Sequence, residues 1–273
     1  MKKTHILLIF VIVCSLHTFG QKEVENWESY IAAYEENKPG STTVRMDIVD
    51  QTPIAEYPYI LVTGIKYESK RADGFPEDET FTLLHKLGDQ LAELINENSK
   101  NMFVGSFMFN FERLEYFYIK TNKGIEHKLK EFYNANYPNN EYYINLKEDK
   151  SWSYYREFLY PNEEILEYLG DQNVVEALIK AGDNLSKARR VDHWTYFDDK
   201  SNMESFKKEI KKLGFKVQDS TKKESEAKPY AVQFYRIDNV DLDSIYSITS
   251  SLRKLAISYQ GDYDGWETSV EKN

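Results

Sequence analysis

The order in which two kinds of hydrophobic periodicity follow one another is the feature of this sequence that most restricts its fold. Strand-like segments alternate with segments whose apolar residues recur every three or four positions, as on one face of a helix. From Ile60 to Leu146 the order is strand, helix, strand, strand, helix, strand. The predicted strands are 60–67, 102–109, 113–120 and 142–146, and the two helix faces carry Phe81, Leu84, Leu87, Leu91, Leu94, Ile95 and then Ile125, Leu129, Phe132, Tyr133.

The same order recurs in the last third of the chain. The predicted strands there are 190–197, 215–219, 230–237 and 262–270, and the helix faces carry Met203, Phe206, Ile210, Leu213 and then Leu242, Ile245, Ile248, Leu252, Leu255. In a β-α-β-β-α-β unit both helices pack on one face of an antiparallel sheet. The sequence therefore predicts an α+β protein made of two tandem ferredoxin-like sandwiches.

Two further segments complete the predicted organisation. From Thr43 to Ile48 apolar and polar residues alternate, which indicates an additional half-buried strand. Residues 161–188 have a helical pattern that Gly170 interrupts. We therefore expect a signal peptide at 1–20, a first domain at 21–161, a helical connector at 162–187 and a second domain at 188–273.

The first twenty residues have the pattern of a secretory signal peptide. Lys2 and Lys3 precede the apolar run from Ile6 to Val13, and a more polar stretch ends in Gly20. Such a run is too short to cross a bilayer, and no later segment approaches the roughly 20 apolar residues that a membrane span needs. We expect cleavage between Gly20 and Gln21 and a periplasmic or secreted protein, with a cytoplasmic location as the alternative.

Charge and residue usage exclude several classes of function. A formal net charge of −10 argues against a protein that binds the nucleic-acid backbone. The one cysteine, Cys14, lies in the predicted signal peptide, and the other candidate metal ligands, His85, His127 and His193, fall on different predicted elements. Neither a phosphate-binding nor a dinucleotide-binding glycine motif is present. The sequence therefore predicts no metal site, no cofactor and no nucleic-acid partner.

The candidate binding residues are polar or aromatic side chains in turns and on strands. Acidic turns of this kind can bind calcium or supply paired acids, although the backbone of an Asp-Gly turn and the start of a helix also favour carboxylates. A histidine beside an aspartate can act as an acid/base pair, and a tryptophan beside a turn serves as a core residue or as a binding anchor. We select as binding candidates, none of them assigned a catalytic role, Asp73, Asp192, His193, Asp262, Asp264, Trp266 and Glu267.

Three short strings in the first half of the chain carry a resemblance to a known family. They are Trp27-x-x-Tyr30, the acidic turn Asp73-Gly74-Phe75-Pro76, and Trp152-x-x-Tyr155 followed by Leu159-Tyr160-Pro161. Over roughly residues 24–161 the sequence resembles the bacterial domain-of-unknown-function family 695. This resemblance implies no active site.

The last 85 residues resemble a second family. Arg190-Val191-Asp192-His193 opens this segment, and Asp262-Tyr263-Asp264-Gly265-Trp266-Glu267-Thr268 closes it. Both strings are similar to the family of the regulator of ribonuclease E activity B. The resemblance implies a small ferredoxin-like domain without catalysis, which inhibits a cytoplasmic RNA-degrading endonuclease by binding the protein rather than RNA.

Three functions are compatible with these observations. The leading hypothesis is a non-enzymatic, exported protein-binding or regulatory module, because fold alone does not transfer a target from one compartment to another. One alternative is a cytoplasmic protein inhibitor of an RNA-degrading endonuclease. The other is a hydrolase that uses the acidic turns.

The export hypothesis makes a direct prediction about the native N-terminus. If residues 1–20 are a signal peptide, the protein isolated from its own cell begins at Gln21. Intact-mass measurement of the native protein checks this. A protein that retains Met1 and is found in the cytoplasm would contradict export.

Overall fold

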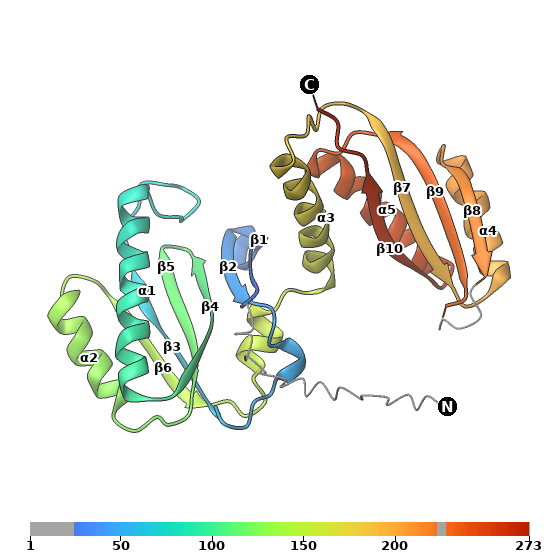
Figure 1. Cartoon of the computed structure of the whole chain (residues 1–273). Helices are drawn as coiled ribbons and strands as arrows, with labels where there is room; N and C mark the ends of the chain where they lie inside the picture. Colours follow the sequence, from blue (N-terminus) through green and yellow to red (C-terminus); the bar gives the residue numbers. More distant parts are fainter. Residues whose placement is uncertain (1–24, 223–227, 273) are drawn as a thin grey trace, which may run out of the picture. The chain divides into compact units, whose positions relative to one another are not determined.

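The computed structural model describes residues 25–222 and 228–272, which divide into two compact units between Leu159 and Tyr160 (Figure 1). The predicted signal peptide lies outside the described residues. Within the described ranges, no helix is long and apolar enough to cross a membrane.

The first unit contains one antiparallel sheet in the strand order β1-β2-β4-β5-β3-β6. From β3 onwards the elements follow the predicted β-α-β-β-α-β order. The strands are β1 (Trp27–Ala33), β2 (Pro39–Arg45), β3 (Tyr59–Lys66), β4 (Asn101–Phe109), β5 (Glu112–Ile119) and β6 (Tyr142–Glu148). The helices are α1 (Asp78–Asn98) and α2 (Ile125–Asn136), with the short helical turns η1 (Glu35–Asn37), η2 (Val49–Gln51) and η3 (Tyr154–Leu159).

Helices α1 and α2 cover one face of this sheet (Figure 1). The predicted apolar stripes form the core between the helices and the strands: Leu84, Leu87, Leu91 and Ile95 of α1 and Ile125, Leu129 and Tyr133 of α2 are buried. A hydrogen bond links the second helix to the sheet, since the hydroxyls of Thr63 and Tyr133 lie 2.7 Å apart. Phe81, which belongs to the predicted α1 stripe, is instead 45% exposed.

The segment after β6 is buried with aromatic residues of the sheet. Trp152 stacks on Tyr118 of β5 with ring centroids 3.8 Å apart, and the Tyr155 hydroxyl donates to the Arg45 carbonyl. Because Tyr118 alternates along β5 with Phe117, which packs in the α1–α2 core, this contact lies on the opposite face of the sheet. The central strands are therefore covered on both faces.

The second unit repeats the element order with a four-stranded antiparallel sheet, β10-β7-β9-β8. Its strands are β7 (Arg189–Phe197), β8 (Lys216–Lys222), β9 (Tyr230–Asp238) and β10 (Gly261–Thr268), and its helices are α3 (Glu163–Lys180), α4 (Lys200–Lys212) and α5 (Leu242–Ser258). Alternate residues of β7 are buried, which places one face of the sheet against the helices. The protein is thus a mixed α+β protein with antiparallel sheets.

Two segments differ from the sequence-based expectation. Strand β1 was not predicted, because Tyr30 is its one buried residue and the strand shows no clear alternation. The predicted strand at 43–48 is displaced, since β2 spans Pro39–Arg45. The other predicted strands and helices correspond to observed elements with small shifts at their ends.

The segment 162–187, expected to be a connector, contributes to the core of the second unit. In α3, Val175 and Leu178 pack with Val191 and Trp266. Asp171 is 2% exposed, accepts a hydrogen bond of 2.9 Å from Trp266 Nε1, and is also bonded by the Thr249 hydroxyl and the Arg253 guanidinium. One buried carboxylate therefore joins α3 to α5 and β10.

Removing this carboxylate should destabilise the second unit. Asp171→Ala leaves three donors without their acceptor, one of them charged, which we expect to lower the free energy of unfolding by roughly 3–5 kcal/mol. Chemical denaturation measures this change, with Glu164→Ala on the exposed side of α3 as the control. Equal stability of the two variants would contradict the role of Asp171.

Candidate functional site

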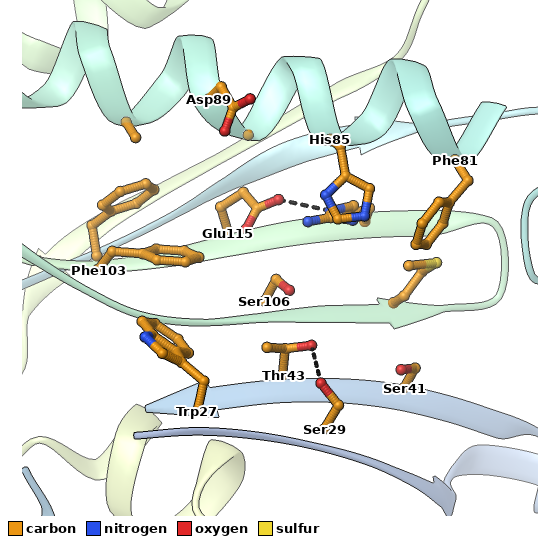
Figure 2. Close-up of a pocket in the computed structure, with 15 residues that line it drawn as sticks. Trp27, Ser29, Ser41, Thr43, Phe81, His85, Asp89, Phe103, Ser106 and Glu115 are labelled. Atoms are coloured by element: carbon orange, nitrogen blue, oxygen red, sulfur yellow. Dashed lines mark hydrogen bonds and ion pairs between the residues drawn. The ribbon is translucent and has the colours of Figure 1, made fainter. Parts of the chain in front are cut away.

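A cavity of about 690 Å³ lies in the first unit between α1 and the strands β1, β2, β4 and β5 (Figure 2). It forms where the sheet extends sideways beyond the part that the two helices cover. Its volume is within the usual range for sites that bind small molecules. The lining combines aromatic residues, hydroxyls and one buried ion pair: Trp27, Ser29, Ser41, Thr43, Phe81, His85, Gly88, Asp89, Ala92, Phe103, Ser106, Met108, Arg113, Glu115 and Phe117.

Hydroxyl and carboxyl side chains form a row across the floor of this cavity. The strand register pairs Ser29 with Thr43, Thr43 with Ser106, and Ser106 with Glu115. Directly paired residues of an antiparallel sheet project from the same face. The hydroxyls of Ser29 and Thr43 lie 2.9 Å apart (Figure 2). Four adjacent strands thus present polar groups along one line.

The buried ion pair joins Arg113 and Glu115 on β5. Arg113 Nε donates to Glu115 Oε1 over 2.7 Å, and the two residues are 8% and 1% exposed. Burial raises the pKa of Glu115, against the opposing effect of the neighbouring guanidinium. Helix α1 accommodates the carboxylate because residue 88 is glycine: a Cβ at this position would lie 3.1 Å from Glu115 Oε1.

Aromatic side chains line two sides of the cavity. The Trp27 and Phe103 rings have centroids 5.4 Å apart, and Phe103 contacts Phe117 at 4.9 Å. Elsewhere in the cavity Phe81 packs edge-on against His85 with centroids 4.4 Å apart. Burial lowers the pKa of His85, which favours its neutral form. The exposure of Phe81 is explained by this position over the cavity rather than in the core.

This cavity contains none of the seven residues selected from the sequence. The two residues of its ion pair, Arg113 and Glu115, are separated on β5 by the apolar Leu114, and local alternation places such charges towards solvent. The structure places them beneath α1, because both faces of β5 are covered. Knowledge of the sheet order would have been needed to identify them.

Asp73 lies in the first unit and is separated in the chain from the other six candidates. Its carboxylate pairs with Arg71 at 2.5 Å and accepts a hydrogen bond from the Phe75 backbone N–H. These two interactions lower the pKa of Asp73 to about 2. The carboxylate thus stabilises the turn before α1.

The pairing of β10 with β7 brings four of the candidates together. Trp266 lies opposite His193, and Glu267 lies opposite Asp192. The two pairs alternate, so they project from opposite faces of the sheet. His193 and Trp266 are buried on the helix side, where Trp266 is 8% exposed, whereas Glu267 is exposed. Trp266 therefore packs as a core residue that also donates to Asp171.

The aspartates among the candidates of the second unit do not converge on one point. Asp192 accepts two hydrogen bonds from Arg190, Asp262 pairs with Lys228 at 2.7 Å, and Asp264 is exposed. No group of three or more metal-ligating side chains is found in residues 25–222 and 228–272.

His193 is enclosed by the core of the second unit. Its Nδ1 lies 2.8 Å from the Tyr263 hydroxyl, and its Nε2 is buried without a hydrogen-bond partner. The rings of Phe215 and Phe234 lie beside it. Burial lowers the pKa of His193 from 6.5 to about 3, with a smaller contribution from Arg236. The histidine is therefore neutral in the folded protein at pH 7.

This burial should make stability depend on pH. Because the unfolded histidine binds a proton near pH 6.5 and the folded one near pH 3, the stabilisation is present above pH 6.5 and is lost as pH falls through this window, by up to about 1.4 kcal/mol per pH unit. Denaturation of His193→Gln between pH 4.5 and 7 should show a shallower dependence than the wild type. The control is His127→Gln, which changes an exposed histidine; a slope unchanged by His193→Gln would contradict the assignment.

No curated protein matches the chain. Among solved structures, the crystal structure of an unknown protein from Galdieria sulphuraria covers 78% of this chain and 99% of its own, with 10% identity and a TM-score of 0.21. A similarity this low supports no conclusion about fold or function.

Two family models match consecutive parts of the chain and confirm both resemblances seen in the sequence. The model described as a family of unknown function, DUF695, matches residues 25–160 and includes the strands and α1 that line the cavity. The second match begins inside α3, just before Asp171, and ends with β10. Residues 25–160 of the chain therefore match the model of DUF695, and residues 170–268 match the model of the family Regulator of ribonuclease activity B.

Proposed function

We propose that this protein is a non-enzymatic regulator whose second unit binds a ribonuclease as its protein partner. The observation that carries the proposal is the match of residues 170–268 to the family Regulator of ribonuclease activity B. The matched segment includes every strand of the second sheet and the buried Asp171 contacts. Regulation by binding requires a recognition surface rather than a reactive group.

The open face of the second sheet supplies such a surface. We define the open face as the outward residues of β7 and β9, which alternate with the buried ones: Arg190, Asp192, Trp194, Tyr196, Ala231, Gln233, Tyr235 and Ile237. The Arg190 guanidinium lies 3.9 Å from the Tyr235 ring centroid. Tryptophan, tyrosine and arginine are the residues that most often dominate binding energy at protein interfaces.

The strand order supports a ferredoxin-like architecture for this unit and for the corresponding part of the first. In the order β10-β7-β9-β8, the first strand of the β-α-β-β-α-β unit, β7, lies between the fourth, β10, and the third, β9. In the order β4-β5-β3-β6 of the first unit, β3 likewise lies between β6 and β5. This strand order is the one expected of the split β-α-β topology. It leaves the sheet face opposite the helices available to a partner.

A second candidate is favoured by the apolar run from Ile6 to Val13 after two lysines. In this proposal the chain is exported, with cleavage near Gly20-Gln21, and the same open face binds a periplasmic or secreted protein instead of a cytoplasmic ribonuclease. The compartment in which the native protein is found separates the two candidates.

The ribonuclease proposal is tested by adding the purified protein to a ribonuclease E-type endonuclease and following cleavage of a labelled RNA. We expect saturable inhibition and direct binding of the two proteins in calorimetry. Trp194→Ala with Tyr235→Ala should weaken binding at least about tenfold, since such anchors contribute about 2 kcal/mol or more. The matched control is Tyr143→Ala, an exposed aromatic residue on a strand of the first unit.

Three results would contradict this proposal. They are unchanged cleavage at saturating protein, equal affinity of the double variant and the wild type, and a gel shift showing that the protein binds the RNA itself. The last result would show that the protein binds the RNA substrate and withholds it from the ribonuclease, rather than binding the ribonuclease.

A further inference from the structure

The ion pair in the cavity of the first unit leaves hydrogen-bonding atoms unused. Within the described residues, Arg113 Nη1 and Nη2 and Glu115 Oε2 have no hydrogen-bond partner, because the pair is joined through Nε and Oε1. Among the described residues, Trp152 Nε1, His193 Nε2 and Thr195 Oγ1 are the polar side-chain atoms that are fully buried and have no hydrogen-bond partner. The unused atoms of Arg113 and Glu115 are not in this set, so they are not fully buried. Since both residues line the cavity, the unused atoms are accessible from it.

These atoms present a donor beside an acceptor. A guanidinium supplies N–H donors, and a carboxylate oxygen accepts. An amide edge has the complementary arrangement, a carbonyl that accepts and an adjacent N–H that donates. A ligand that lacks one of the two groups leaves a polar atom of the buried ion pair without a partner, which is a strong basis for discrimination between similar molecules.

The charge of the cavity favours a neutral ligand. Arg113 is the one lysine or arginine in the lining, and Glu115 already balances it. A carboxylate or phosphate that bound the Arg113 guanidinium in place of Glu115 would leave Glu115 as a buried, unpaired charge, which is energetically unfavourable. Asp89, on the exposed side of α1, adds a further negative charge near the cavity and opposes an anion.

The shape of the lining favours a planar ring. Trp27 and Phe103 form an aromatic wall beside the row of Thr43, Ser106 and Glu115 (Figure 2). Aromatic side chains bind heteroaromatic rings by stacking. The two hydroxyls next to Glu115 can donate to or accept from further ring substituents.

We propose that this cavity binds a neutral heteroaromatic amide of nucleobase size, with its ring against Trp27 and Phe103 and its amide edge on the unused atoms of Arg113 and Glu115. The hydroxyls of Ser106 and Thr43 complete the contacts. This site belongs to the first unit and does not rest on the function proposed for the second.

Two matched probes test the proposal by calorimetry on the full chain. Nicotinamide carries the ring and the amide edge, whereas nicotinate has the same ring with a carboxylate in place of the amide. We expect saturable binding of nicotinamide at least about tenfold tighter than that of nicotinate. Uridine, whose base places an N–H between two carbonyls, should compete with nicotinamide for the cavity.

Variants locate the site. Arg113→Met with Glu115→Leu replaces the pair by apolar side chains of similar size, a change that folded proteins tolerate, and should abolish nicotinamide binding. Ser106→Val keeps the Arg113–Glu115 ion pair and should weaken nicotinamide binding several-fold. If circular dichroism shows that the double variant is unfolded, the affinity of Ser106→Val tests whether nicotinamide binds in the cavity. The control Phe158→Leu changes an aromatic residue outside the cavity and should bind normally.

Each opposite result would overturn the proposal. Absence of saturable nicotinamide binding would remove the ligand class, and tighter binding of nicotinate would show that the guanidinium is a carboxylate receptor. Unchanged affinity in Ser106→Val together with a folded double variant that still binds would place the ligand elsewhere.

Discussion

The first unit depends on the burial of both faces of its central strands. Along β5, Phe117 packs in the core beneath α1 and α2, whereas Tyr118 on the opposite face stacks on Trp152 in the segment after β6. The neighbouring strand β3 is buried at consecutive positions from Ile60 to Ile65, and hence on both of its faces. That segment is held by Asp149, which accepts from the Tyr118 hydroxyl at 2.6 Å and from the backbone N–H groups of Ser153 and Tyr154. The stacking of Trp152 on Tyr118 follows from this anchored turn, in which Trp152 has a φ of 59°.

The cavity is a consequence of adding two strands to a sheet that two helices already cover. Strands β1 and β2 extend the sheet beyond β4, so that α1 borders the added surface from one side. Residues far apart in the sequence, such as Ser29 and Glu115, become members of one row because register is continuous from β1 to β5. The glycine at position 88 then sets how closely the helix approaches that row.

Most of the element order could be predicted from local pattern, but the site in the first unit could not. The stripe Leu84, Leu87, Leu91 identifies α1 because a helix that buries one face repeats its apolar residues in this way. The burial of Arg113 and Glu115 could not be predicted in this way, because period-2 alternation does not reveal that both faces of a strand are covered. Trp266 illustrates the intermediate case: its turn was recognised, whereas its partner Asp171 lies 95 residues away.

The position of Asp171 has a practical consequence for dividing the chain. A fragment beginning at Ala188 would retain β7 to β10 and both helices between them, and would satisfy a boundary drawn from the repeated element order. It would nevertheless lack the acceptor for Trp266, Thr249 and Arg253 and the apolar side chains of α3 that cover Val191. A fragment meant to contain the complete second unit should therefore include α3 as well as the segment from β7 to β10. Its N-terminal boundary belongs before Asn162, which caps α3.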